Sequence, residues 1–288
     1  MEHPISDSIA FSVLNTMGNL PGHRYGYYQI QTTLSVIKYL AFLPPSPEPV
    51  TLATADYKGE KLAFTTVPTG DWNIGRLQHH ATTDKFTLQS TEKAAIQAVE
   101  KVWHPTRVDQ SSLSEALPYN DLLYNLPMYS VRYPGQLGAA QMIAHQEWYP
   151  NDIFGVIQET QIYAQIEGHG IGPRFLAHIT ENQERVCGYL LESHPARHAT
   201  INDLQACTEA LARLHSLKIA YGDLSFYSFL ALDDGQVLLH RFRGSYTTDD
   251  QSVLRKEMKS IEGILRDGPP LLGQHLSAEL HAEIFAIG

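Results

Sequence analysis

Hydrophobic residues recur at helical spacing in the second half of the chain. Within residues 154–167, Ile157, Ile162 and Ile166 fall near one face of a 3.6-residue period. Gly168 follows directly, and glycine at that place commonly ends a helix. The pattern therefore predicts a helix that stops at Gly168.

Two further segments show the same periodicity. The helix predicted over residues 201–217 starts beside Thr200 and Asp203, which have the spacing of a capping box. Its apolar stripe is formed by Leu204, Cys207, Leu211 and Leu214. A final amphipathic helix is marked by four apolar residues, Leu254, Met258, Ile261 and Leu265.

Shorter apolar stretches bounded by turn residues predict β-strands. Residues 175–179 and 185–191 are expected to form adjacent strands, and residues 131–145 a pair of strands. Residues 236–242 predict one more short strand. Between these elements and the start of the chain, residues 91–102 predict a short helix.

The first part of the chain, up to about residue 115, has broken and turn-rich patterning. Residues 25–30 and 33–42 fit strands or a helix, and residues 51–55 and 61–67 flank a hairpin turn. With the mixture of helices and strands that follows, the pattern predicts an α+β fold.

Composition narrows the classes of partner. Of the 288 residues 43% are hydrophobic, which is ample for a core, and the formal net charge of −10 argues against a nucleic-acid surface. No apolar run of membrane-spanning length and no secretion signal is recognised, so we expect no membrane partner. Two cysteines make no disulfide framework, and a reducing, cytoplasmic location is expected.

The clearest chemistry lies in Leu211-Ala-Arg-Leu-His-Ser-Leu-Lys-Ile-Ala-Tyr-Gly-Asp223. A helix ending in Leu-His, a short apolar link and a Gly-Asp loop resemble the catalytic loop of protein-kinase-like enzymes. In those enzymes the Asp orients and deprotonates the attacking hydroxyl, while a later Asn and a second Asp hold magnesium. Asp223 matches the first position. Ser228 stands at the second, and His240 or Arg241 stands at the third.

The resemblance extends upstream of this loop. There the sequence is similar to a fungal group of kinase-like proteins often labelled as alpha-galactosidase A. It covers roughly residues 65 to 268. Four segments carry it: Gly70-Asp-Trp-Asn73, Trp103-His-Pro-Thr-Arg-Val-Asp109, residues 166–176 and Ala196-Arg-His-Ala199. The resemblance implies a protein-kinase-like two-lobe fold with three parts: a β-rich extension at 1–115 packed on the N-lobe, an N-lobe at 116–192 and a compact, truncated C-lobe at 193–288.

That group carries a lysine in a run like Lys-Phe-Ala-Arg-Phe-Glu-Trp. The matching run here is Met142-Ile-Ala-His-Gln-Glu-Trp148, so Met142 stands where the resemblance implies the phosphate-binding lysine. Glu159 keeps the helix carboxylate, without the lysine that would pair with it. Methionine offers an uncharged, polarizable side chain of similar length.

These replacements argue against phosphotransfer. Arg241 cannot ligate a cation, His240 is a poor magnesium ligand, and Ser228 offers one neutral oxygen at most. The loss of each such charge contact lowers the rate of phosphotransfer by a factor of roughly 10²–10⁴. We therefore expect no kinase activity, no cofactor and no metal site. The short stretch after Asp223 also lacks an Ala-Pro-Glu motif, so no peptide-docking platform is expected.

Several residues admit two interpretations. Asp223 is either a general base or a carboxylate that stabilises its loop. Glu159 is either an acid with a raised pKa in a closed cleft, or an exposed residue or member of a new salt bridge. Arg241 is a candidate fixed charge that replaces the metal by pairing with Asp223 or Glu159. His215 is expected to be structural.

Three functions remain open from the sequence. The first is a cleft repurposed for a small apolar or aromatic molecule, as a binder or as a cyclase- or isomerase-type enzyme. Its candidate catalytic groups are Asp223, Glu159, His240 and Arg241, and its candidate ligand-binding residues are Met142, Tyr221, Phe226, Tyr227 and Ser228. The second is a scaffolding pseudokinase that acts through protein partners. The third is a divergent active kinase.

Overall fold

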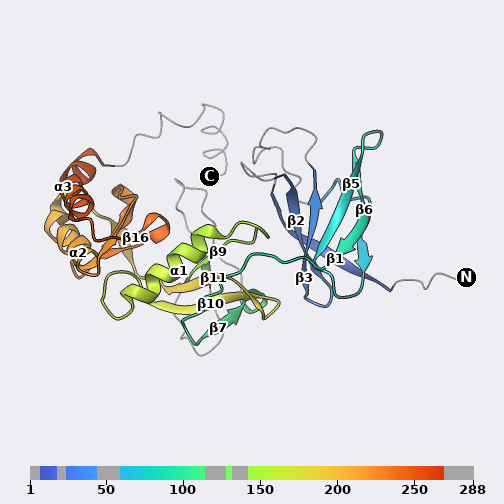
Figure 1. Ribbon diagram of the computed structural model, residues 1–288, viewed down its shortest axis with the longest axis horizontal. Helices are drawn as coiled ribbons and strands as arrows, with labels where there is room; N and C mark the ends of the chain where they lie inside the picture. Colours follow the sequence, from blue (N-terminus) through green and yellow to red (C-terminus); the bar gives the residue numbers. More distant parts are fainter. Residues whose placement is uncertain (1–6, 18–23, 44–58, 114–127, 132–141, 269–288) are drawn as a thin grey trace, which may run out of the picture.

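The computed structural model describes residues 7–17, 24–43, 59–113, 128–131 and 142–268. Over these residues the chain is a mixed α+β protein, as the hydrophobic pattern predicted. Figure 1 shows a β-sheet at the N-terminal side, a second sheet with one helix in the middle, and a helical part beyond it. None of the helices in these ranges is both long and apolar enough to cross a membrane.

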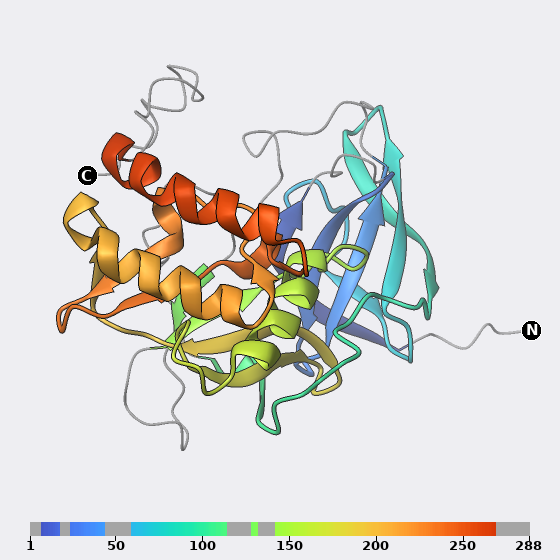
Figure 2. The ribbon, with the colours of Figure 1, turned by 60° about the vertical axis from the view of Figure 1, so that its left-hand side comes forward.

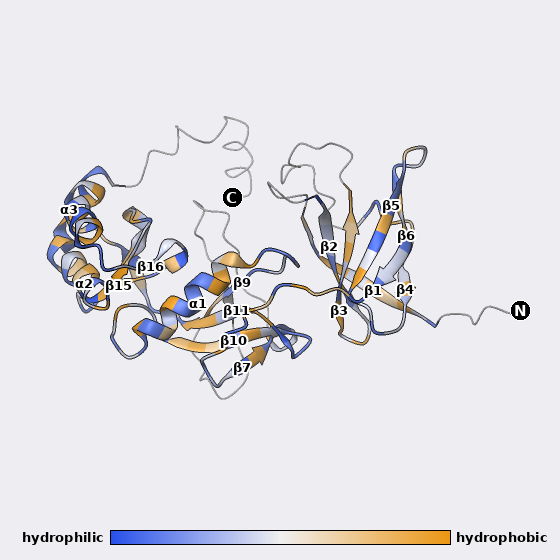
Figure 3. Ribbon diagram, in the orientation of Figure 1, coloured by the Kyte–Doolittle hydropathy of each residue, from blue (hydrophilic) through white to orange (hydrophobic). Residues whose placement is uncertain are grey.

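The first sheet has six strands in the order β4-β1-β2-β3-β5-β6. Neighbours pair antiparallel except β3 and β5, which run parallel. Aromatic and aliphatic residues of β2 and β3 are almost entirely buried. Figure 3 shows hydrophobic residues in orange on strands of both sheets. The strands are β1 (Ser8–Met17), β2 (Gly26–Thr32), β3 (Ile37–Phe42), β4 (Thr66–Pro68), β5 (Ile74–His80) and β6 (Lys85–Glu92).

The second sheet has five strands in the order β7-β10-β11-β9-β8. Its pairs are antiparallel except β7 with β10, which is parallel. The single helix of this part, α1 (Phe154–Ile166), packs on one face of the sheet through one apolar core. The strands are β7 (Arg107–Asp109), β8 (Met128–Val131), β9 (Met142–Gln146), β10 (Phe175–Glu181) and β11 (Arg185–Glu192).

The helical part consists of α2 (Leu204–Ser216) and α3 (Gln251–Asp267), which lie side by side in Figures 1 and 2. Their buried residues join the same apolar core that lies under α1. Short strands connect the helices to the rest of the chain: β12 (Ala196–His198), β13 (Ile219–Ala220), β14 (Phe229–Leu232), β15 (Val237–Leu239) and β16 (Tyr246–Thr247).

The predicted start of the long helix is confirmed. A short 3-10 turn at Ile201–Asp203 leads into α2, and Thr200 and Asp203 form the capping box that their spacing indicated. Asp203 accepts from the Thr200 backbone N–H at 2.8 Å, and Arg197 donates to the same carboxylate at 2.7 Å. The segment before the helix is thereby tied to the first turn of that helix.

One expectation about the region before residue 115, the short helix over residues 91–102, was wrong. Residues 93–100 form no helix, because their backbone hydrogen bonds go to other segments: Gln97 N–H to Pro150 O and Val99 N–H to Val186 O. In the same region, β7 pairs with β10 and so belongs to the second sheet. Residues 51–55 of the expected hairpin lie outside the described residues.

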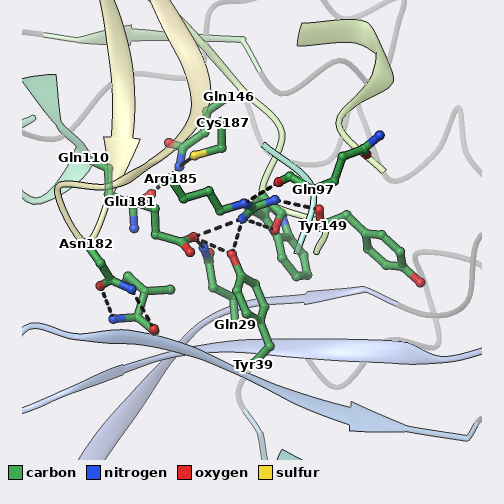
Figure 4. A network of polar contacts seen from close by, with 12 residues as sticks. Gln29, Tyr39, Gln97, Gln110, Gln146, Tyr149, Glu181, Asn182, Arg185 and Cys187 are labelled. Carbon is green, nitrogen blue, oxygen red and sulfur yellow. Dashed lines mark hydrogen bonds and ion pairs between the residues drawn. The ribbon is translucent and has the colours of Figure 1, made fainter. Parts of the chain in front are cut away.

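A buried polar network joins the two sheets (Figure 4). Arg185 donates to Tyr39 Oη at 2.5 Å, to Tyr149 O at 2.9 Å and to Gln97 O at 2.8 Å, and it lies 3.4 Å from Glu181. Tyr39 Oη donates to Glu181 as well. Since Tyr39 is on β3 and Glu181 and Arg185 are at the β10–β11 turn, the network fixes one sheet against the other.

The first two motifs of the resemblance have structural explanations. In Gly70–Asn73, the carbonyls of Gly70 and Trp72 accept from the buried Lys38 ammonium, which also lies 4.1 Å from the Trp72 ring. In the second motif, Asp109 accepts from Ser111 N–H at 3.1 Å, and from two groups of the second sheet, Thr180 Oγ1 at 3.2 Å and Gln183 N–H at 2.7 Å. Both motifs therefore anchor segments to a sheet.

Candidate functional site

Hydrogen bonds to helix α3 hold the loop at residues 221–223. Glu257 on that helix accepts from the backbone N–H of Tyr221 at 3.0 Å and of Gly222 at 2.7 Å. His215, at the end of α2, lies 2.8 Å from the same carboxylate. His215 thus has the structural role predicted for it, and Glu257 is a loop-fixing residue that sequence reasoning missed.

Gly222 and Tyr221 fix the loop against the segment at residues 240–244. Gly222 has φ +87°, and a Cβ there would lie 2.0 Å from the carbonyl oxygen of Gly244. The Tyr221 hydroxyl donates to His240 O at 2.5 Å and to Arg241 O at 3.1 Å. This network places the exposed side chain of Asp223 beside the turn at residues 242–244.

The Glu257 carboxylate makes the loop sensitive to acid. Burial on its own raises its pKa, but hydrogen bonds from His215, Gly222 and Tyr221 outweigh burial and hold the pKa below its ordinary 4.5. Because the folded-state pKa is depressed, the stabilisation is fully present above pH 4.5 and is lost as the pH falls below it.

We predict that Glu257→Gln lowers the free energy of unfolding at pH 7 by about 1–3 kcal/mol, since the amide cannot accept from all three donors. The difference from wild type should shrink in urea titrations at successively lower pH below 4.5. Glu262→Gln is the matched control, because Glu262 lies on the same helix in an exposed pair with Arg266. A constant Glu257→Gln deficit across pH would contradict the prediction.

His240 is a buried, neutral member of this part rather than an accessible acid or base. Its Nε2 lies 2.6 Å from Tyr227 O, and its backbone N–H donates to Ser228 O at 3.3 Å. Burial, with the positive charge of Arg241 next to it, lowers the pKa of His240 to about 3. Ser228 Oγ is also occupied, because it accepts from Ser225 N–H at 2.9 Å.

Glu159 is buried and has acquired new partners. It lies on α1, where His145 Nδ1 is 2.8 Å from its carboxylate and the Tyr189 hydroxyl donates to it. Tyr189 Oη is also 2.6 Å from His145 Nδ1. Burial raises the pKa of Glu159, but the His145 charge and the hydrogen bonds from His145 and Tyr189 outweigh it and lower that pKa. Of the interpretations weighed for Glu159, the new salt bridge is the one present.

The position that the resemblance aligns with the lysine does not face Glu159. Met142 is buried on the opposite face of β9, in an apolar cluster with Ala144 and Ile179. Side chains alternate along a strand, so His145, three positions on, faces α1 where Met142 does not. Comparison of the two sequence runs placed Met142 at the position of the lysine, whereas the residue that contacts Glu159 is His145.

Glu147 and Arg243 form a second contact that the sequence did not single out. Glu147 Oε2 accepts from Val156 N–H at 3.3 Å at the start of α1, and Glu147 Oε1 lies 3.1 Å from Arg243 Nη1. Burial raises the pKa of Glu147 against the charges of His145 and Arg243, which lower it. This pair ties β9 and α1 to the turn that follows β15.

The structure brings the four candidate catalytic residues into one region. The charges of Glu159, Arg241 and Asp223 all influence the buried Tyr221 hydroxyl, whose pKa burial raises. Arg241 has φ +64°, a conformation unusual for a residue with a side chain.

The candidate ligand-binding residues differ in access. Tyr221, Tyr227 and Ser228 are buried, and Met142 faces away from the region. Phe226 is partly exposed, with its ring 5.4 Å from that of His198.

Across the described part of the chain, no group of three His, Cys, Asp or Glu side chains is placed to hold a metal ion. The chain matches no protein-family model and no curated protein.

Proposed function

We propose that this chain is a catalytically degenerate protein of the protein-kinase-like, two-lobe class, without phosphotransferase activity. In this proposal the region between α1 and the loop at residues 221–228 is repurposed for a small apolar or aromatic molecule. The chain then acts as a binder or as an enzyme of the cyclase or isomerase type, without a nucleotide cofactor.

One observation carries the proposal. The side chains that the resemblance aligns with the helix glutamate and the magnesium ligands of kinases have internal partners instead. Glu159 is bound by His145 and Tyr189, Ser228 by Ser225, and His240 by Tyr227. Phosphate transfer needs cations and hard oxygen donors that face the nucleotide, and buried groups with protein partners do not supply them.

The accessible groups favour a small molecule. Asp223 is exposed, and Phe226 is partly exposed. They offer one carboxylate for acid–base work and one aromatic surface beside a rigid loop. The net charge of −10 argues against a nucleic-acid partner, as it did at the level of composition.

A thermal-shift titration tests the proposal. The purified chain is titrated with ATP plus magnesium, with ATP plus manganese, and with a panel of small aromatic and apolar metabolites. We expect no nucleotide-dependent shift and stabilisation by one metabolite class, weakened in Asp223→Asn. Silence across the whole panel would favour a scaffolding protein that acts through partner surfaces. A shift with ATP plus metal that Asp223→Asn abolishes would indicate a divergent active kinase.

A further inference from the structure

Residues 148–153 lead from β9 into α1, and they pack on the first sheet. The Tyr149 hydroxyl donates to Tyr25 O, just before β2. Asn151 Nδ2 donates to Tyr27 Oη on β2 at 3.0 Å. The Tyr149 and Tyr27 rings lie 5.0 Å apart between centroids and share one apolar cluster. The first sheet therefore holds the segment from which α1 starts.

The start of α1 is bonded by side chains from outside the helix. The first N–H groups of a helix have no partner within it, and the N-cap residue Ile153 makes no side-chain cap. Gln97, in the segment between the two sheets, accepts from Ile153 N–H through Oε1 at 2.8 Å. Glu147 accepts from Val156 N–H, as described above. The position of the first turn of α1 therefore depends on segments that belong to both sheets.

Gly155 lets this first turn contact the C-terminal part of the chain. A Cβ at Gly155 would lie 2.5 Å from Glu147 Oε1 and 3.0 Å from Arg243 Cζ. The ion pair of Glu147 with Arg243 therefore lies directly against the helix backbone, where only glycine leaves room for it. Arg243 belongs to the turn Phe242–Gly244, so α1 and this turn are in direct contact.

The same turn contacts the loop that carries Asp223. A Cβ at Gly244 would lie 3.0 Å from Asp223 Cβ, so the two backbones are closely packed. Ser245 Oγ, directly after the turn, donates to Tyr221 O at 2.8 Å. A displacement of the turn at residues 242–244 would therefore displace the loop as well.

We propose that the first sheet regulates the position of Asp223, through residues 148–153, the first turn of α1 and the ion pair of Glu147 with Arg243. Each step of this route is a packed or hydrogen-bonded contact between neighbouring elements, the kind of connection that carries coupling between distant sites. The inference rests on the proposed function, because it names the regulation of that same site. A partner that shifts the first sheet would act on the site without touching it.

Hydrogen exchange of the full chain, without any ligand, tests the route from its far end. Tyr27→Phe removes the hydroxyl that accepts from Asn151 but keeps the buried ring. The amides of Tyr221 and Gly222, which donate to Glu257, report on the loop. We expect their exchange to rise about 2- to 30-fold, the range of ordinary coupling between distant sites. Tyr246→Phe is the control, because Tyr246 is exposed, and it should leave these amides unchanged.

A second variant interrupts the route in the middle. Gly155→Ala places a methyl group where the ends of two flexible side chains lie, so it displaces the ion pair without a backbone clash. We expect faster exchange of the loop amides, although alanine is the better helix former. Gly263→Ala on α3 is the matched control, because a Cβ there meets nothing within 4 Å, and it should not raise exchange.

The double variant Tyr27→Phe, Gly155→Ala decides whether the two sites share one route. Since Gly155→Ala has already interrupted it, the double variant should exchange no faster at the loop than Gly155→Ala alone. Additive effects, a rise confined to residues 26–32 and 148–157, or an equal rise in every peptide would overturn the inference. These measurements need no ligand, so a metabolite panel without a binder would refute the proposed function and leave the exchange result as it stands.

Discussion

Replacing Arg185 by Met should remove about 3–5 kcal/mol from the free energy of unfolding, one of the two largest single effects that the structure predicts. Methionine keeps most of the aliphatic volume but leaves Glu181, which is 1% exposed, without its cation. It also leaves the carbonyls of Gln97 and Tyr149 without the guanidinium that donates to them. Because Tyr39 belongs to the same network, the two sheets should lose their fixed contact.

Arg174→Met is the matched control. Arg174 lies 3.0 Å from Glu192, but 64% of its side chain is exposed, and such pairs contribute about 0–1 kcal/mol. Urea titration at pH 7 gives both values. The double variant Arg185→Met, Glu181→Gln should recover part of the loss, because it removes the stranded carboxylate. Equal effects of Arg185→Met and Arg174→Met would show that the network does not join the sheets.

The second large effect is expected for Gly222→Ala. The positive φ of +87° would cost about 1–3 kcal/mol for any side chain. The new Cβ would lie 2.0 Å from Gly244 O, a backbone atom, so relieving that clash costs about 1–3 kcal/mol more. The shift would also pull the loop away from Glu257 and displace Asp223.

Gly235→Ala separates the two contributions. Gly235 has nearly the same φ, +84°, but a Cβ there meets nothing within 4 Å. We therefore expect Gly235→Ala to show the conformational cost alone, and Gly222→Ala to unfold at a clearly lower urea concentration. Similar midpoints for the two variants would mean that the contact between residues 222 and 244 does not constrain the loop.

Local patterning predicted most of the second half of the fold. The three helices were recognisable because their apolar residues repeat at helical spacing, and α2 also carries its capping box at Thr200 and Asp203. Strands β10 and β11 are almost entirely buried, so their runs of apolar residues marked them clearly. These signals are contained within single segments of ten to twenty residues.

Features that depend on distant segments could not be predicted. The non-helical segment at residues 93–100 forms backbone hydrogen bonds with Pro150 and Val186, which no local pattern shows. The partner of Glu159 depends on which face of β9 lies toward α1, and alignment by motif chose Met142 where the strand presents His145. The role of Glu257 could not be predicted, because its hydrogen-bond donors are backbone N–H groups more than thirty residues away.

The most direct test of the central claim is calorimetric titration of the full chain with ATP and magnesium, followed by measurement of γ-phosphate release. The proposal predicts no heat of binding and no release above the protein-free rate, because the side chains that the resemblance aligns with the helix glutamate and the magnesium ligands have internal partners. Saturable binding with metal-dependent release, lost in Asp223→Asn, would contradict it and make the chain an active kinase.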